Sequence, residues 1–223
     1  MKRIKLKDRL LPDYTRGEEK MNMVTHIVGG GLGVAALGLC LSRALRYGDG
    51  FALAGALVYS CAMILLYTMS SVYHGMLPST GKKVLQVLDH CTIYLLIAGT
   101  YTPIALCNLR SVNPILGWGM LIFQWGLAAV AITLTAIDLK KYNVFSMICY
   151  FGMGWAILPF LGIARQSLGE TGFFCLLVGG IVYTVGAVLY GIGSKKRWFH
   201  SVFHIFVVLG SLLQLLCVAF YVL

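Results

Sequence analysis

Charged side chains are scarce in this sequence. Only 12% of its 223 residues are Asp, Glu, Lys or Arg, whereas soluble globular domains average about 25%. Acidic residues are the rarer of the two signs, with 8 Asp and Glu against 18 Lys and Arg. Hydrophobic residues make up 59% of the chain, and the mean hydropathy is +0.82. The shortage of charge excludes a soluble globular domain and indicates a polytopic membrane protein.

Cysteine motifs and a secretion signal are also lacking. No Cys-x-x-Cys pair occurs, and the seven cysteines are scattered through the apolar runs, so we expect small packing side chains and no disulfide framework. The basic stretch Met1 to Arg9 is followed by only Leu10 and Leu11 before Pro12, which is too short for the apolar part of a signal peptide. The sequence therefore predicts a protein that stays in the membrane and is not secreted.

The net charge of +10 is concentrated in the first 20 residues and in the connections between apolar runs. This distribution predicts membrane orientation and argues against nucleic-acid binding. We expect residues 1–20 to form a basic cytoplasmic tail, which either contacts anionic membrane lipid or stays solvated and only fixes the orientation.

Seven apolar runs follow, each close to the ~20 residues that a spanning helix needs. They lie at 23–44, 51–73, 86–108, 114–136, 144–164, 172–192 and 199–222. The short connections between them predict antiparallel neighbours in one bundle. The expected fold is an all-α integral membrane protein, with seven transmembrane helices in a single domain over residues 21–223. The pattern carries no signal for an oligomeric state.

The distribution of Lys and Arg predicts the orientation of the bundle. If the N-terminus lies inside, 14 basic residues fall on the cytoplasmic side and 4 on the outer side. Cytoplasmic segments carry the excess of Lys and Arg. We therefore expect a cytoplasmic N-terminus and, after seven crossings, an external C-terminus.

Two histidines open the last apolar run, His200 and His204. Residues at i and i+4 lie on one face of a helix, one turn apart, which suits two ligands of one metal ion. The same face continues through Ser211 and Gln214, within roughly an 80° arc at about 100° per residue. Ionisable groups inside a membrane are costly, so they point to a functional site.

The predicted orientation brings further polar residues to the depth of these two histidines. The expected second helix ends at Ser70 and His74, and the third begins near Asp89 and His90. Three imidazoles, those of His74, His200 and His204, would make a three-nitrogen site for Zn²⁺, with a fourth position left to water. Asp89 could accept a proton from that water, and Ser70 could hydrogen-bond the water, a ligand imidazole or Asp89.

Each of these residues also has a simpler interpretation. The histidines could hydrogen-bond to neighbouring helices without a metal. Asp89 could pair with Lys82 or Lys83. His90 points about 100° away from Asp89 on a helix, so we do not expect it to bind the same ion.

A second group of polar residues begins the first helix. Glu19, Asn22 and His26 are spaced to share one face at the cytoplasmic end. They either contribute to the same pocket or serve in capping and interface hydrogen bonds. The nearby run Gly29-Gly-Gly-Leu-Gly33 predicts close packing of two helices. Pro103 should bend the third helix, and Pro159 should bend the fifth.

The order and spacing of these motifs resemble a known family. Over nearly the whole chain, the sequence resembles the hemolysin III branch of the progestin and adipoQ receptor family. The motifs that carry the resemblance are Ser70-x-x-x-His74, Asp89-His90, His200-x-x-x-His204, Glu19-x-x-Asn22-x-x-x-His26 and Gly99-Thr-Tyr-Thr-Pro103. The resemblance implies a zinc site of three histidines near the cytoplasmic face, with Asp89 near the bound water. A more distant similarity to the alkaline ceramidases, which share the serine, aspartate and three-histidine pattern, implies a hydrolase acting on a lipid amide.

Three functions follow as expectations for a protein of the bacterial plasma membrane. The first is a zinc hydrolase that cleaves an amide or ester of a membrane lipid, with catalytic Asp89 and Ser70. The second is a non-enzymatic, lipid-responsive homeostasis or receptor-like protein in which zinc only joins helices. The third is a cytolytic pore, which the very apolar runs and the expected retention in the membrane disfavour.

Overall fold

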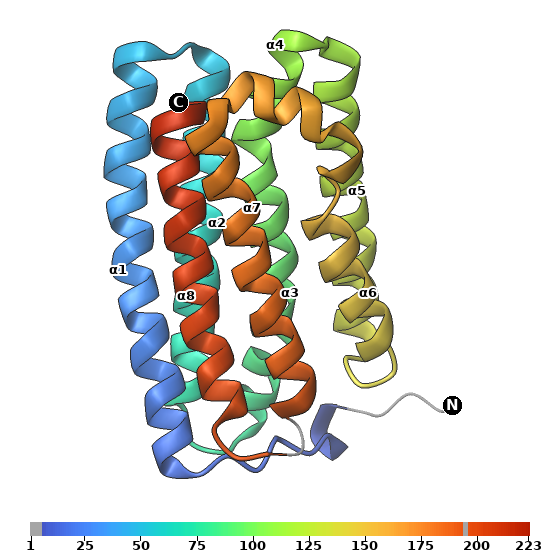
Figure 1. Ribbon diagram of the computed structural model, residues 1–223. Coiled ribbons are helices and arrows are strands. Elements are labelled where there is room, and N and C mark those ends of the chain that lie inside the picture. The colour runs from blue at the N-terminus through green and yellow to red at the C-terminus, as the bar shows by residue number, and fades with distance from the viewer. Residues whose placement is uncertain (1–5, 194–195) are drawn as a thin grey trace.

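The computed structural model describes residues 6–193 and 196–223, and within these ranges every regular element is helical and no strand occurs. The long helices form one upright bundle (Figure 1). The N-terminal segment lies at the end of the bundle where α8 begins, and the C-terminus lies at the opposite end. The basic residues among positions 1–5 and at 195, which the charge count used, fall outside the described residues.

The helices reproduce five of the seven expected apolar runs. They are α1 (Arg16–Tyr47), α2 (Gly50–Gly75), α3 (Thr80–Pro103) continued by the π-helical η2 (Ile104–Leu109) and the short α4 (Arg110–Val112), α5 (Pro114–Ile137), and α8 (Phe199–Cys217) continued by the π-helical η4 (Val218–Val222). A short 3₁₀ turn, η1 (Leu6–Asp8), precedes them. Thr15, Asp49, Ser79 and Asn113 cap the helices that they precede by accepting backbone N–H groups, which stabilises each helix start.

The expected runs 144–164 and 172–192 do not form two separate straight helices. The structure has α6 (Asn143–Gly154), a 3₁₀ turn η3 (Leu158–Phe160) and α7 (Leu161–Gly193). Pro159 lies in η3, where it interrupts the helix as its missing N–H requires. Gly169 bends α7 with a φ of 68°, a conformation that glycine adopts without strain. The first turns of α7 therefore lie across the end of the bundle before the rest descends (Figure 1).

Six helical stretches of the described residues are long and apolar enough to cross a membrane, because the stretch Asn143–Ile192 counts as a single one. The all-helical membrane architecture is thereby confirmed. The count of seven crossings and the orientation stay predictions.

Close packing of α1 against α2 depends on glycine. A Cβ added at Gly29 would lie 2.3 Å from the Tyr67 ring, and one at Gly33 would lie 2.9 Å from the Ile64 side chain. Small residues at these positions let the two helices approach closely, as the sequence predicted. This approach brings the start of α1 beside the end of α2, where the polar residues gather.

The outer surface of the bundle is apolar, and many polar side chains are inside it. Val28, Ile122 and Phe174 are each more than 60% exposed. In contrast, the Gln124 side chain is fully buried on α5, where its amide nitrogen donates to the carbonyl of Met153 at 2.9 Å. Large exposed apolar area with polar groups paired inside is the arrangement that a lipid environment favours.

Candidate metal centre

The polar residues singled out in the sequence come together at the end of the bundle that holds the N-terminal segment. His74 lies in the last turn of α2, whereas His200 and His204 lie in the first turns of α8. Asp89 lies in the first half of α3, and Ser70 lies one turn before His74. Three helices, α2, α3 and α8, thus contribute side chains to one place.

The three histidines form a buried cluster. His74, His200 and His204 each offer one ring nitrogen, and these atoms lie within 4.8 Å of one another. The three residues are 3%, 9% and 1% exposed. The Nε2 atoms of His200 and His204 are 3.1 Å apart.

The chemistry of these nitrogens fits a metal ion. Nε2 of His74 and Nδ1 of His204 are buried and have no hydrogen-bond partner among the described residues. Leaving a buried polar atom unpaired costs about 1–3 kcal/mol, so the unpaired Nε2 of His74 calls for a ligand, whereas His204 faces His200 through its other nitrogen, Nε2. The cluster can hold a metal ion through its three imidazoles, as the sequence predicted, and the identity of that ion as zinc stays a prediction.

Asp89 and Ser70 face the same cavity as the histidines. Both line it together with His200 and His204. The alternative pairing of Asp89 with Lys82 does not occur, because the Lys82 ammonium lies 2.6 Å from a Glu19 oxygen and donates to the Met76 carbonyl at 2.8 Å.

His90 takes part in other contacts, as its direction on the helix predicted. Its Nδ1 lies 2.8 Å from the Gln86 carbonyl oxygen, and its Nε2 lies 3.1 Å from the Tyr190 hydroxyl. The Asp89 carboxylate lies 3.8 Å from His90 Nδ1. His90 therefore borders the cavity without joining the histidine cluster.

The residues at the start of α1 also reach the cluster. A Glu19 oxygen lies 2.6 Å from His74 Nδ1, and the Asn22 amide nitrogen lies 3.4 Å from the same atom. The His26 ring stacks on His204 with a centroid distance of 3.7 Å. Capping is carried out by Glu18, which forms a reciprocal capping box with Thr15. Glu19 and Asn22 thus lie beside His74, and His26 lies beside His204 and lines the cavity.

Tyr14 is a site residue that the sequence reasoning missed. Its ring stacks on His200, with centroids 4.9 Å apart and planes 15° apart. Burial raises the pKa of the Tyr14 hydroxyl above its ordinary value, and the nearby Tyr190 and Glu19 add to this effect. The sequence did contain one signal for Tyr14. The capping box Thr15-x-x-Glu18 starts α1 at Arg16, so Tyr14 directly precedes the helix that carries Glu19, Asn22 and His26.

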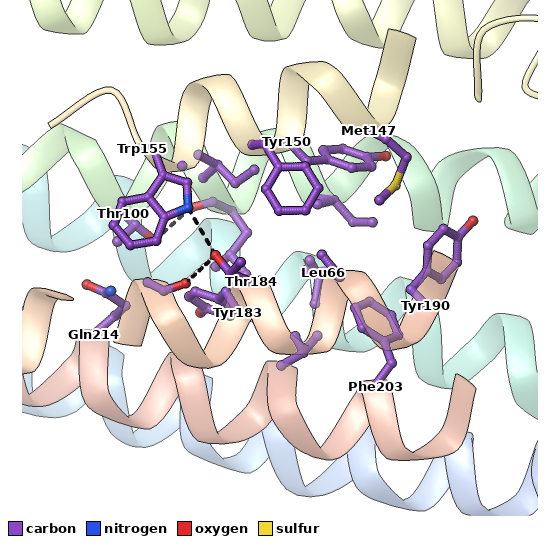
Figure 2. Close-up of a pocket in the computed structure, with 18 of the residues that line it drawn as sticks. Leu66, Thr100, Met147, Tyr150, Trp155, Tyr183, Thr184, Tyr190, Phe203 and Gln214 are labelled. Carbon is purple, nitrogen blue, oxygen red and sulfur yellow. Dashed lines mark hydrogen bonds between the residues drawn. The ribbon is translucent and has the colours of Figure 1, made fainter. Parts of the chain in front are cut away.

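A cavity of about 170 Å³ extends from the histidines into the bundle. Its walls are mainly apolar and come chiefly from α3, α6, α7 and α8. Figure 2 shows Tyr190 and Phe203 at one end, and both rings lie within 6 Å of the His200 ring. Trp155 and Gln214 lie at the other end, where the Trp155 indole donates to Thr184 at 3.0 Å. The histidine cluster is therefore the polar end of a long apolar pocket.

Comparison with known proteins identifies the family. The family described as "Haemolysin-III related" matches residues 14–215. The chain is 38% identical to "Hemolysin-3" of Bacillus cereus over 92% of both chains. It is 35% identical to "Hemolysin-3 homolog" of Bacillus subtilis (strain 168), over 93% of this chain and 96% of the relative.

A human relative extends the comparison beyond bacteria. The chain is 29% identical to the human "Monocyte to macrophage differentiation factor", over 68% of this chain and 63% of that protein. This match supports the link to the progestin and adipoQ receptor family that the motifs resembled. With its membrane-spanning helices and bacterial relatives, the protein is a multi-pass bacterial membrane protein. The chain belongs to the haemolysin-III-related family.

Proposed function

We propose that this protein is a zinc-dependent hydrolase of the bacterial plasma membrane that cleaves an amide or ester bond of a membrane lipid. The observation that carries the proposal is a single juxtaposition. Three buried imidazoles, a carboxylate and a hydroxyl meet at the end of an apolar cavity, and Nε2 of His74 has no hydrogen-bond partner among the described residues. A cavity that is apolar along its length and polar at one end suits a substrate with a long hydrocarbon chain and one polar linkage.

Zinc is the metal that the donor set favours. It prefers nitrogen and sulfur ligands in tetrahedral geometry. Two nitrogens bound to one tetrahedral zinc at about 2.0–2.1 Å would be about 3.3 Å apart, and His200 Nε2 and His204 Nε2 are 3.1 Å apart. A set of three protein ligands, not four, is typical of catalytic zinc. A zinc ion held there would supply a Lewis acid that polarises a carbonyl oxygen and acidifies water.

The chain's own residues would carry the remaining steps. The Asp89 carboxylate would accept a proton from the attacking water, whose oxygen bonds to the carbonyl carbon of the substrate. The C–N or C–O bond then breaks, and Asp89 would return the proton to the departing amine or alcohol. The Ser70 hydroxyl would hydrogen-bond the substrate carbonyl or Asp89. The apolar walls would hold the acyl chain and exclude bulk water.

The proposal includes a topology, with seven crossings, a cytoplasmic N-terminus and an external C-terminus. Its support is the count of 14 basic residues on one side against 4 on the other. This orientation puts the metal centre near the cytoplasmic face, on the side of the N-terminal segment.

A non-enzymatic role is the second candidate, and one contact favours it. The Tyr14 ring stacks on His200, so the N-terminal segment contacts the histidine cluster directly. The cluster itself brings together His74 of α2 and two histidines of α8. A metal bound there would tie these helices together and make their packing sensitive to the lipid that fills the cavity. In that case the zinc would be structural.

The experiment that separates the two uses purified protein in lipid nanodiscs. Zinc-loaded protein, chelator-treated protein and a His74→Ala variant are incubated with a panel of lipid amides and esters, and released fatty acid is measured by mass spectrometry. Hydrolysis that requires zinc and His74 supports the enzyme. Stoichiometric zinc without release of fatty acid from any lipid of the panel would reject the hydrolase and favour the structural role.

A further inference from the structure

Two adjacent glutamates at the start of α1, Glu18 and Glu19, have different roles. Successive residues of a helix point about 100° apart. Glu18 closes the capping box with Thr15 and accepts the backbone N–H of Trp198 at 2.7 Å. Glu19 turns towards α2, where one carboxylate oxygen lies 2.6 Å from Nδ1 of His74. One glutamate therefore fixes where the helix begins, and the other contacts a member of the histidine cluster.

The contact with Glu19 decides which nitrogen of His74 carries the ring proton. A carboxylate can only accept hydrogen bonds, so a contact of 2.6 Å requires that Nδ1 carries the ring proton and donates a hydrogen bond to Glu19. The Asn22 amide nitrogen, 3.4 Å from the same Nδ1, is itself a donor and cannot hydrogen-bond a protonated Nδ1, so the hydrogen bond of this nitrogen goes to Glu19. With the proton on Nδ1, the lone pair of the neutral ring lies on Nε2, the buried atom without a partner among the described residues.

Lys82 holds Glu19 in place. The Lys82 side chain is 4% exposed, and its ammonium lies 2.6 Å from the second carboxylate oxygen of Glu19. It also donates to the carbonyl of Met76, the C-cap residue of α2, at 2.8 Å. The Glu19 side chain is partly buried, and such a carboxylate keeps its charge when a cation and hydrogen bonds compensate for lost hydration. Lys82 on α3 therefore fixes Glu19 on α1 and the end of α2 that carries His74.

We propose that Glu19 and Lys82 are a positioning pair for the metal centre, in which Lys82 orients the Glu19 carboxylate and Glu19 sets the tautomer and direction of His74. The inference rests on the metal binding in the proposed function and deepens it. A carboxylate that accepts a hydrogen bond from the ring N–H of a metal-binding histidine fixes the ring and makes it a better ligand. The pair also makes metal affinity depend on α1 and α3, which contribute no ligand of their own.

The test measures zinc affinity of purified protein by competition with a chromophoric chelator. Loss of such an outer carboxylate typically weakens metal binding about 10–100-fold, and we expect that loss for Glu19→Gln. Glu18→Gln is the matched control, because it removes a neighbouring buried carboxylate that contacts no histidine of the cluster. Its zinc affinity should equal that of the wild type, although its thermal unfolding temperature should fall.

A second variant separates positioning from folding. The double substitution Glu19→Gln with Lys82→Met removes both charges, so that no buried ion is left unpaired. It should unfold near the wild-type temperature without metal and still bind zinc about 10–100-fold more weakly. The visible spectrum of the Co²⁺-loaded double variant should differ from that of the wild type, because the direction of His74 has changed.

The outcomes distinguish this inference from the proposed function. Wild-type zinc affinity in folded Glu19→Gln and in the double variant would overturn the positioning role while leaving the zinc site standing. Equal weakening in Glu18→Gln would also overturn it, because the effect would then belong to the helix start. A wild-type protein that binds no zinc would overturn the proposed function together with this inference. Zinc binding without lipid hydrolysis would reject the hydrolase alone.

Discussion

Replacement of Asp89 by asparagine should separate metal binding from chemistry. The three ligand atoms of the cluster come from His74, His200 and His204, and Asp89 lies beside them on the wall of the cavity. Asparagine keeps the size of the side chain and can still hydrogen-bond, but it cannot accept a proton from water. Loss of a general base costs roughly 10²–10⁴-fold in rate, which corresponds to about 3–5 kcal/mol in the activation barrier. Zinc should be retained when the metal is saturating, because a residue outside the ligand set changes affinity by only about 10–100-fold.

The assay compares zinc content and lipid hydrolysis of the same purified samples. The control is Asp49→Asn at the N-cap of α2, far from the cluster, where asparagine caps as well as aspartate. That variant should keep both zinc and activity. Loss of zinc from Asp89→Asn comparable with the loss in a histidine variant would refute the reasoning, because Asp89 would then be a direct ligand. Unchanged turnover would remove Asp89 from the mechanism.

Two further predictions concern the membrane fold. A reporter fused after Leu223 should be active only outside the cytoplasm, and a reporter active only inside would reverse the orientation and move the metal centre to the outer face. Gly29→Ala should destabilise the bundle by about 1–3 kcal/mol in thermal or denaturant unfolding, because the new Cβ would meet the Tyr67 ring, whose hydroxyl donates to Ser211. The control Gly31→Ala faces open space and should leave the unfolding midpoint unchanged or raise it; equal destabilisation by both substitutions would contradict the packing argument.

Much of the architecture follows from hydropathy and charge. Long apolar runs specify long helices, and counting Lys and Arg placed the ends of α2, α3 and α8 at one depth. The cluster of His74, His200 and His204 then follows from the i, i+4 spacing on α8 and the position of one histidine on α2. Helical spacing and the sum of Lys and Arg can both be read from the sequence alone, so these predictions need no knowledge of tertiary contacts.

Local departures from these patterns could not be predicted in the same way. Pro159 indicated a bend, but hydropathy alone does not reveal that α6 ends at Gly154 or that α7 turns at Gly169, because these breaks depend on how the surrounding helices pack. The pairing of Glu19 with His74 needed the distance between α1 and α2, which the close approach at Gly29 sets. Tyr14 lies outside any helix, so no periodicity pointed to its contact with His200.

The most direct test of the central claim is the zinc content of the purified protein. Elemental analysis of the wild type should give one zinc per chain, and the variant with His200→Ala and His204→Ala should contain none, because it loses two of the three ligand atoms that lie within 4.8 Å of one another. A wild type without zinc, or equal zinc in the wild type and the double variant, would contradict the account of this site as a metal centre.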